Sequence, residues 1–178
     1  IDGQNEYRCV LNGGIIDGFI AAYGTHKRYG GGICNCGGMV RNCITNNNQC
    51  YSYGSGIYNT GGDVRYSMAD NNAHIGIYNR GGNLISCIAK SNVKEGIFNL
   101  YGNVIHCTSV HNKVGIHTEY GLVANSIMWN NKDRDFTGNY FKFYYSCFAD
   151  GYYRNNNINK DPLFVAVPTS LRLSQSSP

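Results

Sequence analysis

Short apolar runs recur at a regular spacing along this chain, and glycine- and asparagine-rich corners separate them. Seven residues after the isoleucine of each recurring Gly-Ile pair stands another aliphatic residue, and fifteen residues after it stands an asparagine. The pairs follow one another at steps of 24, 20, 20 and 19 residues: Gly32-Ile33, Gly56-Ile57, Gly76-Ile77, Gly96-Ile97 and Gly115-Ile116. Three kinds of position that stay in phase over five copies predict a solenoid.

The apolar runs predict strands rather than helices. In the third copy, Ile77–Asn79 and Asn83–Ala89 are separated by the corner Gly81-Gly82, and no segment shows a sustained helical periodicity. Gly and Asn supply the positive φ angles that tight corners require. Strands this short, recurring about every 20 residues, should each pair with their equivalent one turn later. The pattern therefore predicts an all-β parallel β-helix with turns, or rungs, stacked about 4.8 Å apart.

In such a coil, equivalent residues form columns along the axis. We expect one aliphatic column in the core, at Ile33, Ile57, Ile77, Ile97 and Ile116. The next column should face outward and stack ring on ring in its middle rungs, at Cys34, Tyr58, Tyr78, Phe98 and His117. Two asparagine ladders should satisfy backbone groups at the corners, one at Asn35, Asn59, Asn79, Asn99 and Thr118, the other at Asn48, Asn72, Asn92, Asn112 and Asn131.

The phase extends beyond the five copies. Upstream, Cys9, Ile16 and Gly24 each stand 24 residues before Ile33, Val40 and Asn48, which predicts an earlier rung. Downstream, the segment 144–148 is expected to resume the pattern after an insertion loop at 132–142, and a shorter insertion at 49–55 enlarges an earlier rung.

We therefore predict a single domain over residues 1–178, with about seven rungs in a rod about 34 Å long. Solenoid ends need caps, and neither end of the sequence shows an evident one. The chain is accordingly expected to be part of a longer protein.

Charge and hydropathy exclude some functional classes. Only 15% of the residues are charged, the net charge is +4, and the basic residues are spread out, which argues against a nucleic-acid-binding surface. No apolar stretch approaches the roughly 18 residues that a membrane span requires.

Eight cysteines would suggest a disulfide framework, but the column pattern argues against one for half of them. Cys43, Cys87, Cys107 and Cys147 are predicted to share one inward column with Phe19, Ser67 and Ser126, as free buried thiols. Cys34, Cys36 and Cys50 with His26 would supply four zinc ligands, but no standard zinc spacing supports such a site. We therefore predict no metal site, and a local disulfide that involves Cys50 remains open.

The repeats resemble those of a known family. The strings Gly14–Ile20, Gly30–Ile33 and Gly37–Ile44 are similar to those of the right-handed parallel β-helix repeat proteins, the pectin-lyase-like secreted and surface proteins of bacteria. A more distant resemblance is to the chlamydial polymorphic outer-membrane proteins. The tail that begins at Asp161 resembles the segment that closes such domains, at 161–178. The resemblance implies a right-handed coil and an extracellular or cell-surface location.

This superfamily includes polysaccharide lyases and glycoside hydrolases, and each of these activities requires particular catalytic groups. A hydrolase needs two carboxyl groups about 5–9.5 Å apart, and no such pair emerges from the eleven acidic residues. Lyase chemistry would need clustered aspartates for Ca²⁺ and a basic residue. The nearest approach is Asp17 with Arg41 and Arg65, which also fits an exposed ion pair.

The candidate binding residues are the ring column Tyr58, Tyr78, Phe98 and His117. Aromatic stripes bind sugars or proteins, and they also stabilise a β ladder without any ligand. The main prediction is a non-catalytic extracellular module that acts as a rigid scaffold or adhesin-like surface for a polysaccharide or a host or neighbouring cell. The alternatives are a carbohydrate-active enzyme, either a polysaccharide lyase or a glycoside hydrolase, and a filament-forming segment.

Overall fold

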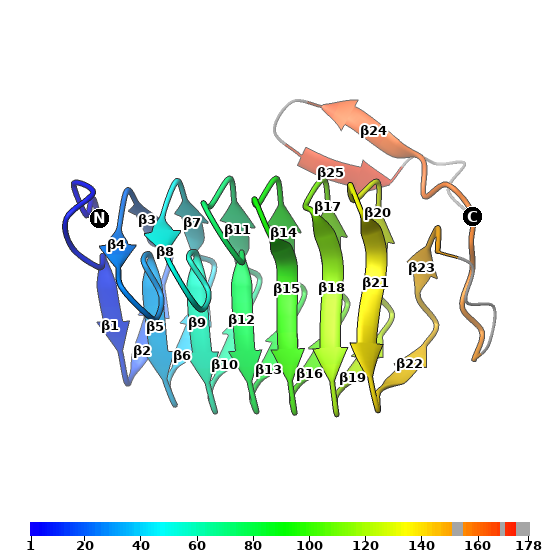
Figure 1. Ribbon diagram of the computed structural model, residues 1–178, viewed down its shortest axis with the longest axis horizontal. Coiled ribbons are helices and arrows are strands. Elements are labelled where there is room, and N and C mark those ends of the chain that lie inside the picture. Colours follow the sequence, from blue (N-terminus) through cyan, green and yellow to red (C-terminus); the bar gives the residue numbers. More distant parts are fainter. Residues whose placement is uncertain (151–154, 168–169, 174–178) are drawn as a thin grey trace.

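The computed structural model describes residues 1–150, 155–167 and 170–173, most of which wind into three seven-stranded parallel sheets (Figure 1). The first sheet contains β1 (Val10–Asn12), β5 (Ile33–Cys36), β9 (Ile57–Thr60), β12 (Ile77–Arg80), β15 (Glu95–Leu100), β18 (Val114–Glu119) and β21 (Arg134–Asn139). The second contains β2 (Ile15–Asp17), β6 (Met39–Arg41), β10 (Asp63–Arg65), β13 (Asn83–Ile85), β16 (Asn103–Ile105), β19 (Leu122–Ala124) and β22 (Lys142–Tyr144). The third contains β3 (Ile20–Ala22), β7 (Ile44–Asn46), β11 (Met68–Asp70), β14 (Ile88–Lys90), β17 (Thr108–Val110), β20 (Ile127–Trp129) and β23 (Cys147–Phe148).

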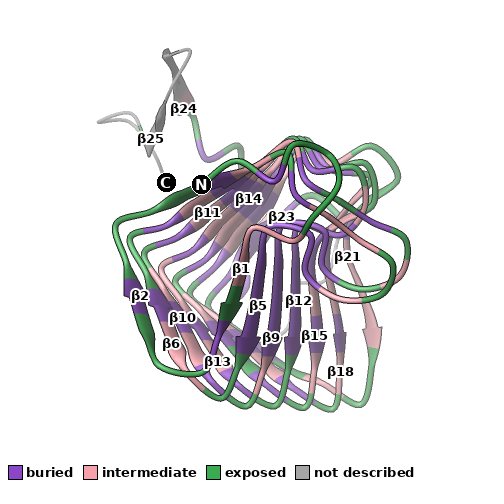
Figure 2. Cartoon of the chain, turned by 90° about the vertical axis from the view of Figure 1, so that its left-hand side faces the viewer, coloured by how far each residue is buried: buried purple, intermediate pink, exposed green. Residues whose placement is uncertain are grey.

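Each rung passes through the three sheets in order and then begins the next rung. Viewed from the N-terminal end, the chain turns clockwise as it recedes (Figure 2). The molecule is a right-handed parallel β-helix. The predicted fold class, the number of rungs and the handedness are confirmed. The part of the chain that the structure describes has no helix long and apolar enough to cross a membrane.

One side chain of each regular strand points into the helix and forms the core. The predicted isoleucine column is in register and fully buried, and Val10 and Phe136 extend it at its two ends. Three phenylalanines occupy the core of the last rung, where Phe143 lies 4.5 Å from Phe136 and 4.8 Å from Phe148 between ring centroids. These rings fill the C-terminal end of the core with large apolar groups.

Both asparagine ladders are present and buried. In the first, each Nδ2 donates to the Oδ1 of the next rung at 2.6–2.8 Å, from Asn12 as far as Asn99, which donates to Thr118 Oγ1 at 2.9 Å. In the second, the ladder ends on Asp135, whose Oδ1 accepts the amide hydrogen of Asn131 Nδ2 at 2.8 Å. The ladders therefore satisfy buried polar groups from rung to rung, as the sequence predicts.

The earliest rung differs by one residue from its predicted register. Val10, and not Cys9, pairs with Ile33, whereas Ile16 pairs with Val40 as predicted. The cause is the first corner, where two residues, 13–14, replace the three residues 36–38 of the next rung. A shorter corner moves the preceding strand by one position relative to its neighbour.

The predicted insertion loop at 132–142 is wrong, because most of it is regular structure. Residues Arg134–Asn139 form β21, which pairs with β18 and places Phe136 in the core column. The pair Asp135-Phe136 stands where earlier rungs have Gly-Ile, so the sequence signature of the rung is lost. The shorter insertion is also ordered: β8 (Gln49–Cys50) pairs with β4 (Thr25–His26).

Two cysteine predictions need correction. Cys43 and Cys107 lie in the predicted column, since their backbone N–H groups donate to Ser67 and Ser126 hydroxyls of the next rung. In the last rung, Ser146 takes this position, and Cys147 pairs one residue later with Ile127. All eight cysteines are free thiols, so the disulfide left open at Cys50 does not form; its thiol donates to the Tyr53 carbonyl at 3.4 Å.

After β23 the chain adds part of another turn, and the closing segment then forms a hairpin. Ile158 pairs with Cys147 next to β23. Strands β24 (Phe164–Val167) and β25 (Ser170–Leu173) pair antiparallel and stand outside the coil (Figure 1). Of the predicted closing segment 161–178, residues 168–169 and 174–178 lie outside the described residues.

Candidate functional site

The predicted ring column lies on the outward side of the first sheet in the expected register. Ring centroids are 5.5 Å apart between Tyr58 and Tyr78, 5.0 Å between Tyr78 and Phe98, and 4.6 Å between Phe98 and His117, and each pair is stacked. The stacking prediction is therefore confirmed. However, only 8% of Tyr58 and 7% of Tyr78 are exposed, so these two rings are not part of an open surface.

The connections that lead from the third sheet to the first cover these rings. In two rungs these connections are longer and fold back over the first sheet. Between ring centroids, Tyr29 lies 4.7 Å from Tyr58, and Tyr53 lies 4.8 Å from Tyr78. Ile75 completes the buried cluster. Burial raises the pKa of the Tyr58 and Tyr78 phenols. The prediction that Tyr58 and Tyr78 offer an exposed binding stripe is therefore wrong, because loops that the column pattern does not place lie on top of them.

The column emerges from this cover in its later rungs, where Phe98 and His117 are half-buried. His117 lies between two polar side chains: its Nδ1 is 2.9 Å from Thr137 Oγ1, and its Nε2 is 3.3 Å from Glu119 Oε1. The three groups form a short hydrogen-bonded chain on the outer side of β18 and β21. A carboxylate and a hydroxyl thus hold the imidazole in one orientation.

Beside this column stands a second row of rings that the sequence analysis missed. Tyr101, Tyr120 and Tyr140 are stacked at 5.3 and 5.0 Å, and they are 61%, 51% and 78% exposed. Their positions correspond to glycines in earlier rungs, at Gly37, Gly61 and Gly81, and all six residues have positive φ. A side chain in this conformation costs about 1 kcal/mol. The signal that would have revealed the row is its spacing of 19 and 20 residues, the period of the repeat itself.

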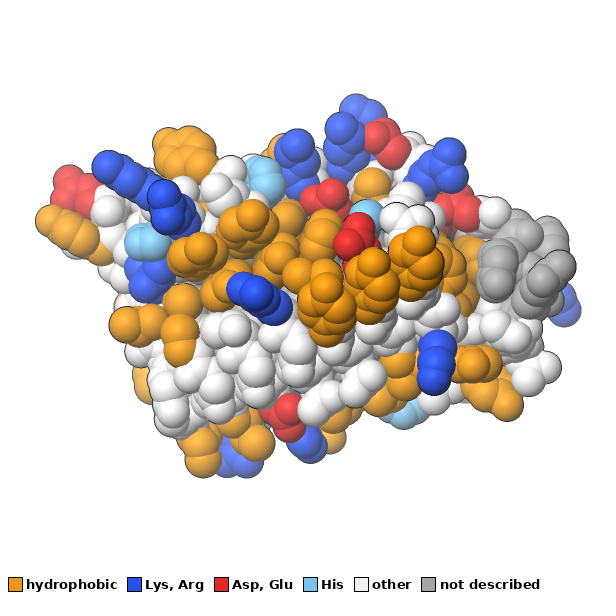
Figure 3. Space-filling view, turned by 60° about the horizontal axis from the view of Figure 1, so that its bottom comes forward, with side chains coloured by type: hydrophobic (Ala, Val, Ile, Leu, Met, Phe, Trp, Pro, Cys, Tyr) orange, Lys and Arg blue, Asp and Glu red, His pale blue; other side chains and the backbone are white. Residues whose placement is uncertain are grey.

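We call the resulting surface the aromatic face. It consists of three outward columns on and beside β15, β18 and β21: Phe98, His117 and Thr137; Leu100, Glu119 and Asn139; Tyr101, Tyr120 and Tyr140. A row of hydrophobic side chains runs along the molecule in the view of Figure 3, with an acidic and a histidine side chain close to it. The face therefore combines an apolar ridge with hydrogen-bonding groups.

The candidate catalytic residues lie on a different face. Asp17 and Arg41 form an exposed ion pair at 3.0 Å on the outer side of the second sheet. A hydrogen bond from Asn42, more than the nearby charge of Arg41, lowers the pKa of the Asp17 carboxyl. Arg65 continues the column in register but turns to Asp63, at 2.7 Å. Asp17 and Arg41 thus form one ordinary surface ion pair and Arg65 belongs to another, both on the second sheet and not on the aromatic face.

The cysteine pair on the first sheet also forms a cluster. Cys34 and Cys36 point to the same side of β5, with their sulfur atoms 3.7 Å apart. Burial raises the pKa of the Cys34 thiol to about 11, so it is protonated at neutral pH. Among the described residues, no group of three or more His, Cys, Asp and Glu side chains has the arrangement of a metal site.

Comparisons with known proteins assign no family to this chain. No protein-family model matches the chain, and no curated protein matches it. Among solved structures, pectate lyase Pel9A is similar, with a TM-score of 0.47 and 13% identity over 83% of this chain. This chain spans 57% of the length of that protein. Similarity at this level says nothing about activity, and the β-helix itself follows from the strand pairing.

Proposed function

We propose that this chain is a non-catalytic, extracellular or cell-surface β-helix module that binds a polysaccharide on its aromatic face. The observation that carries the proposal is the exposed row of Tyr101, Tyr120 and Tyr140. Three tyrosines replace glycine at a backbone conformation that disfavours side chains. The fold does not require rings there, because earlier rungs make the same corner with glycine.

The chemistry of the face suits a sugar chain. Sugars present apolar C–H faces and hydroxyl edges, and tyrosine offers both a ring and a polar hydroxyl. Glu119 and His117 add an acceptor and a polar ring within the same rungs. The groups repeat along the axis at the spacing of the rungs, so an extended polymer would meet equivalent contacts repeatedly. The backbone beneath them is already held in parallel sheets, so binding costs little conformational entropy.

The external location is supported by the resemblance of the repeats to secreted and surface β-helix proteins of bacteria. In that setting, the module would act as a rigid scaffold or adhesin-like surface of a larger protein. Its partner would be a polysaccharide of a plant or bacterial surface.

Replacement of Tyr120 by Gly should weaken polysaccharide binding roughly tenfold, because it removes the central ring of the row. Tyr120 has a φ of 53°, so glycine keeps the backbone conformation without strain. Affinity electrophoresis against a panel of plant and bacterial polysaccharides would find the ligand, and calorimetry would measure the change.

The matched control is Tyr66→Gly, since Tyr66 is also a corner tyrosine, with a φ of 49° and 62% exposure, on another edge of the helix. It should bind like the unmodified protein. The proposal fails if no polysaccharide binds, or if both variants lose the same affinity.

A second candidate function, a carbohydrate-active enzyme, is favoured by the position of His117 between Glu119 and Thr137. A histidine held in this way has the arrangement of a general base, which contributes about 10²–10⁴-fold to a reaction rate. Under the main proposal, incubation with the polysaccharide panel should give no shortened products. Depolymerisation that is lost in His117→Ala but kept in Asp17→Ala would establish the enzyme instead. Loss in Asp17→Ala or Arg41→Ala would locate lyase chemistry on the second sheet.

A further inference from the structure

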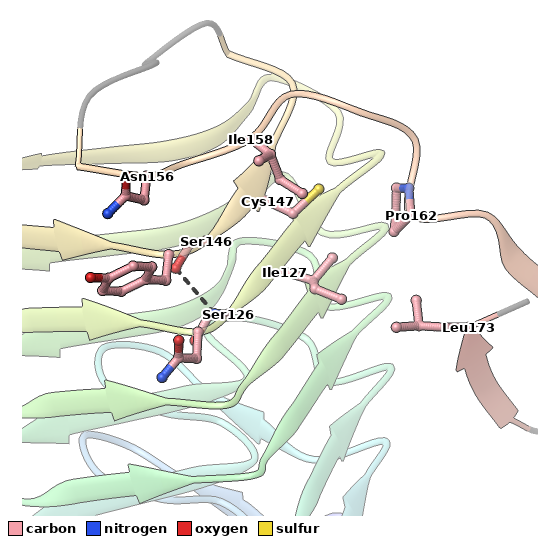
Figure 4. Close-up of a pocket in the computed structure, with 10 residues that line it drawn as sticks. Ser126, Ile127, Ser146, Cys147, Asn156, Ile158, Pro162 and Leu173 are labelled. Carbon is pink, nitrogen blue, oxygen red and sulfur yellow. Dashed lines mark hydrogen bonds between the residues drawn. The ribbon is translucent and has the colours of Figure 1, made fainter. Parts of the chain in front are cut away.

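A pocket of about 310 Å³ lies at the C-terminal end of the helix, outside the third sheet. It is bounded on one side by the last rungs and on the other by the closing segment (Figure 4). It does not involve the aromatic face, which belongs to the first sheet and its following corner. Its volume is at the lower end of the range of small-molecule sites.

Three polar side chains form one wall of the pocket, at Asn125, Tyr145 and Asn156. They occupy equivalent corner positions in successive turns, with φ values of 50°, 49° and 58°. Their backbones are tied to the coil, since Asn125 N–H donates to the Tyr144 carbonyl and Tyr145 N–H to the Asn155 carbonyl. Within the described part of the chain, no hydrogen bond reaches these three side chains. Two amides and a phenol are therefore available to a ligand.

Apolar side chains of the coil, and others of the closing segment opposite the coil, make up most of the remaining lining. Ile127 lies in β20, and Ile158 lies two turns later, where it bridges to Cys147. Pro162 and Leu173 of β25 belong to the closing segment, and Leu173 stands across from Ile127 (Figure 4). The Cys147 thiol between them is engaged with the Lys160 carbonyl at 3.1 Å. No charged side chain is among the residues that line the pocket, so nothing there would compensate the charge of an ionic ligand.

We propose that this pocket binds a single uncharged sugar ring, either a free monosaccharide or the end unit of a glycan. A pyranose has an apolar C–H face and an edge of hydroxyl groups. The face fits against the isoleucine and leucine side chains, and the hydroxyls meet amides that both donate and accept hydrogen bonds. The ring of Tyr145 supplies a further apolar contact.

An upstream groove serves as a comparison, because the closing segment does not line it. Asn42 and Tyr66 stand beside Ile44 and Met68 in the same two columns, in an open groove. This groove has no counterpart of Pro162 or Leu173. It presents a corner tyrosine beside apolar side chains with one wall missing, and its Asn42 amide already donates to Asp17 Oδ1 at 2.8 Å, so it should not retain a sugar.

The test is titration of neutral monosaccharides, including glucose, galactose, mannose and N-acetylglucosamine, into the isotope-labelled full chain, followed by NMR. At least one should shift the side-chain amide signals of Asn125 and Asn156 and leave the ring signals of Tyr66 in the upstream groove unchanged. Galacturonate, which is charged, should bind at least tenfold more weakly. Absence of any shift at these amides, or equal binding of galacturonate, would overturn the proposal.

The variants Asn156→Gly and Leu173→Ala should each reduce the affinity for the neutral sugar about tenfold, since each removes contacts from one wall. Glycine suits the positive φ of Asn156, so the corner is retained. Tyr66→Phe is the matched control for Tyr145→Phe, and only the latter should weaken binding. Tyr120→Gly should leave this site unchanged, which separates it from the polysaccharide surface. Equal effects of the pocket variants and their control would contradict the assignment.

Discussion

Replacement of Leu84 by Ala should lower the free energy of unfolding by roughly 2–5 kcal/mol. Leu84 is fully buried in the core column of the second sheet, between Val64 and Val104 of the adjacent rungs. Both neighbours are held by backbone hydrogen bonds, so they cannot move into the space that a shorter side chain leaves. The cavity therefore persists, and its cost adds to the lost burial. Urea unfolding followed by circular dichroism would measure the change.

The control for this prediction is Leu11→Ala, the same substitution at an outward position of the first rung. Leu11 is 68% exposed, so its truncation removes little buried area and should change the stability by less than about 0.5 kcal/mol. A Leu84 variant as stable as the Leu11 variant would mean that the columns do not form the packed core described above.

Replacement of Asn79 by Ala should cost about 2–4 kcal/mol of unfolding free energy, because it interrupts a buried ladder. Asn79 Nδ2 donates to Gly82 O at 2.9 Å and to Asn99 Oδ1 at 2.8 Å, and its Oδ1 accepts from Asn59 Nδ2 at 2.7 Å. Alanine leaves the buried Asn99 oxygen without this donor. Leaving a buried polar atom without a partner destabilises a protein by more than a typical hydrogen bond stabilises it. Chemical denaturation would measure the loss.

Asn103→Ala provides the comparison, since Asn103 also donates from Nδ2 to the asparagine of a neighbouring rung, at 2.9 Å, but does so in solvent. Water replaces that partner, so the expected cost is below about 0.5 kcal/mol. Similar losses in the two variants would show that burial of the ladder contributes nothing to its effect.

The fold could be predicted from the sequence because the repeat imposes its own geometry. Once Ile57, Ile77 and Ile97 are placed in one column, the period fixes their neighbours, and both asparagine ladders follow without further information. Prediction failed where a rung lacks the signature. At β21, Asp135-Phe136 replaces Gly-Ile, and the larger ring lies in the last strand of the first sheet, where it packs against Phe143.

The candidate site was harder to predict, because exposure depends on segments outside the repeat. Tyr58, Tyr78 and Phe98 share one column. Loops nevertheless bury the first two, through Tyr29 over Tyr58 and Tyr53 over Tyr78, whereas Phe98 is half-buried. The row at Tyr101 follows the period, but in earlier rungs the same column holds glycines, so no residue type is common to the whole column.

The sequence by itself determined the coil, its rungs, its core and its ladders. These features depend on contacts between residues one period apart, and such contacts can be inferred directly from a periodic sequence. Only the tertiary structure decided which outward side chains meet solvent and where a pocket forms. Loops such as the one with Tyr53 and the closing segment with Pro162 fold across several rungs. Contacts of that kind depend on the path of non-repeating segments in space, which no period encodes.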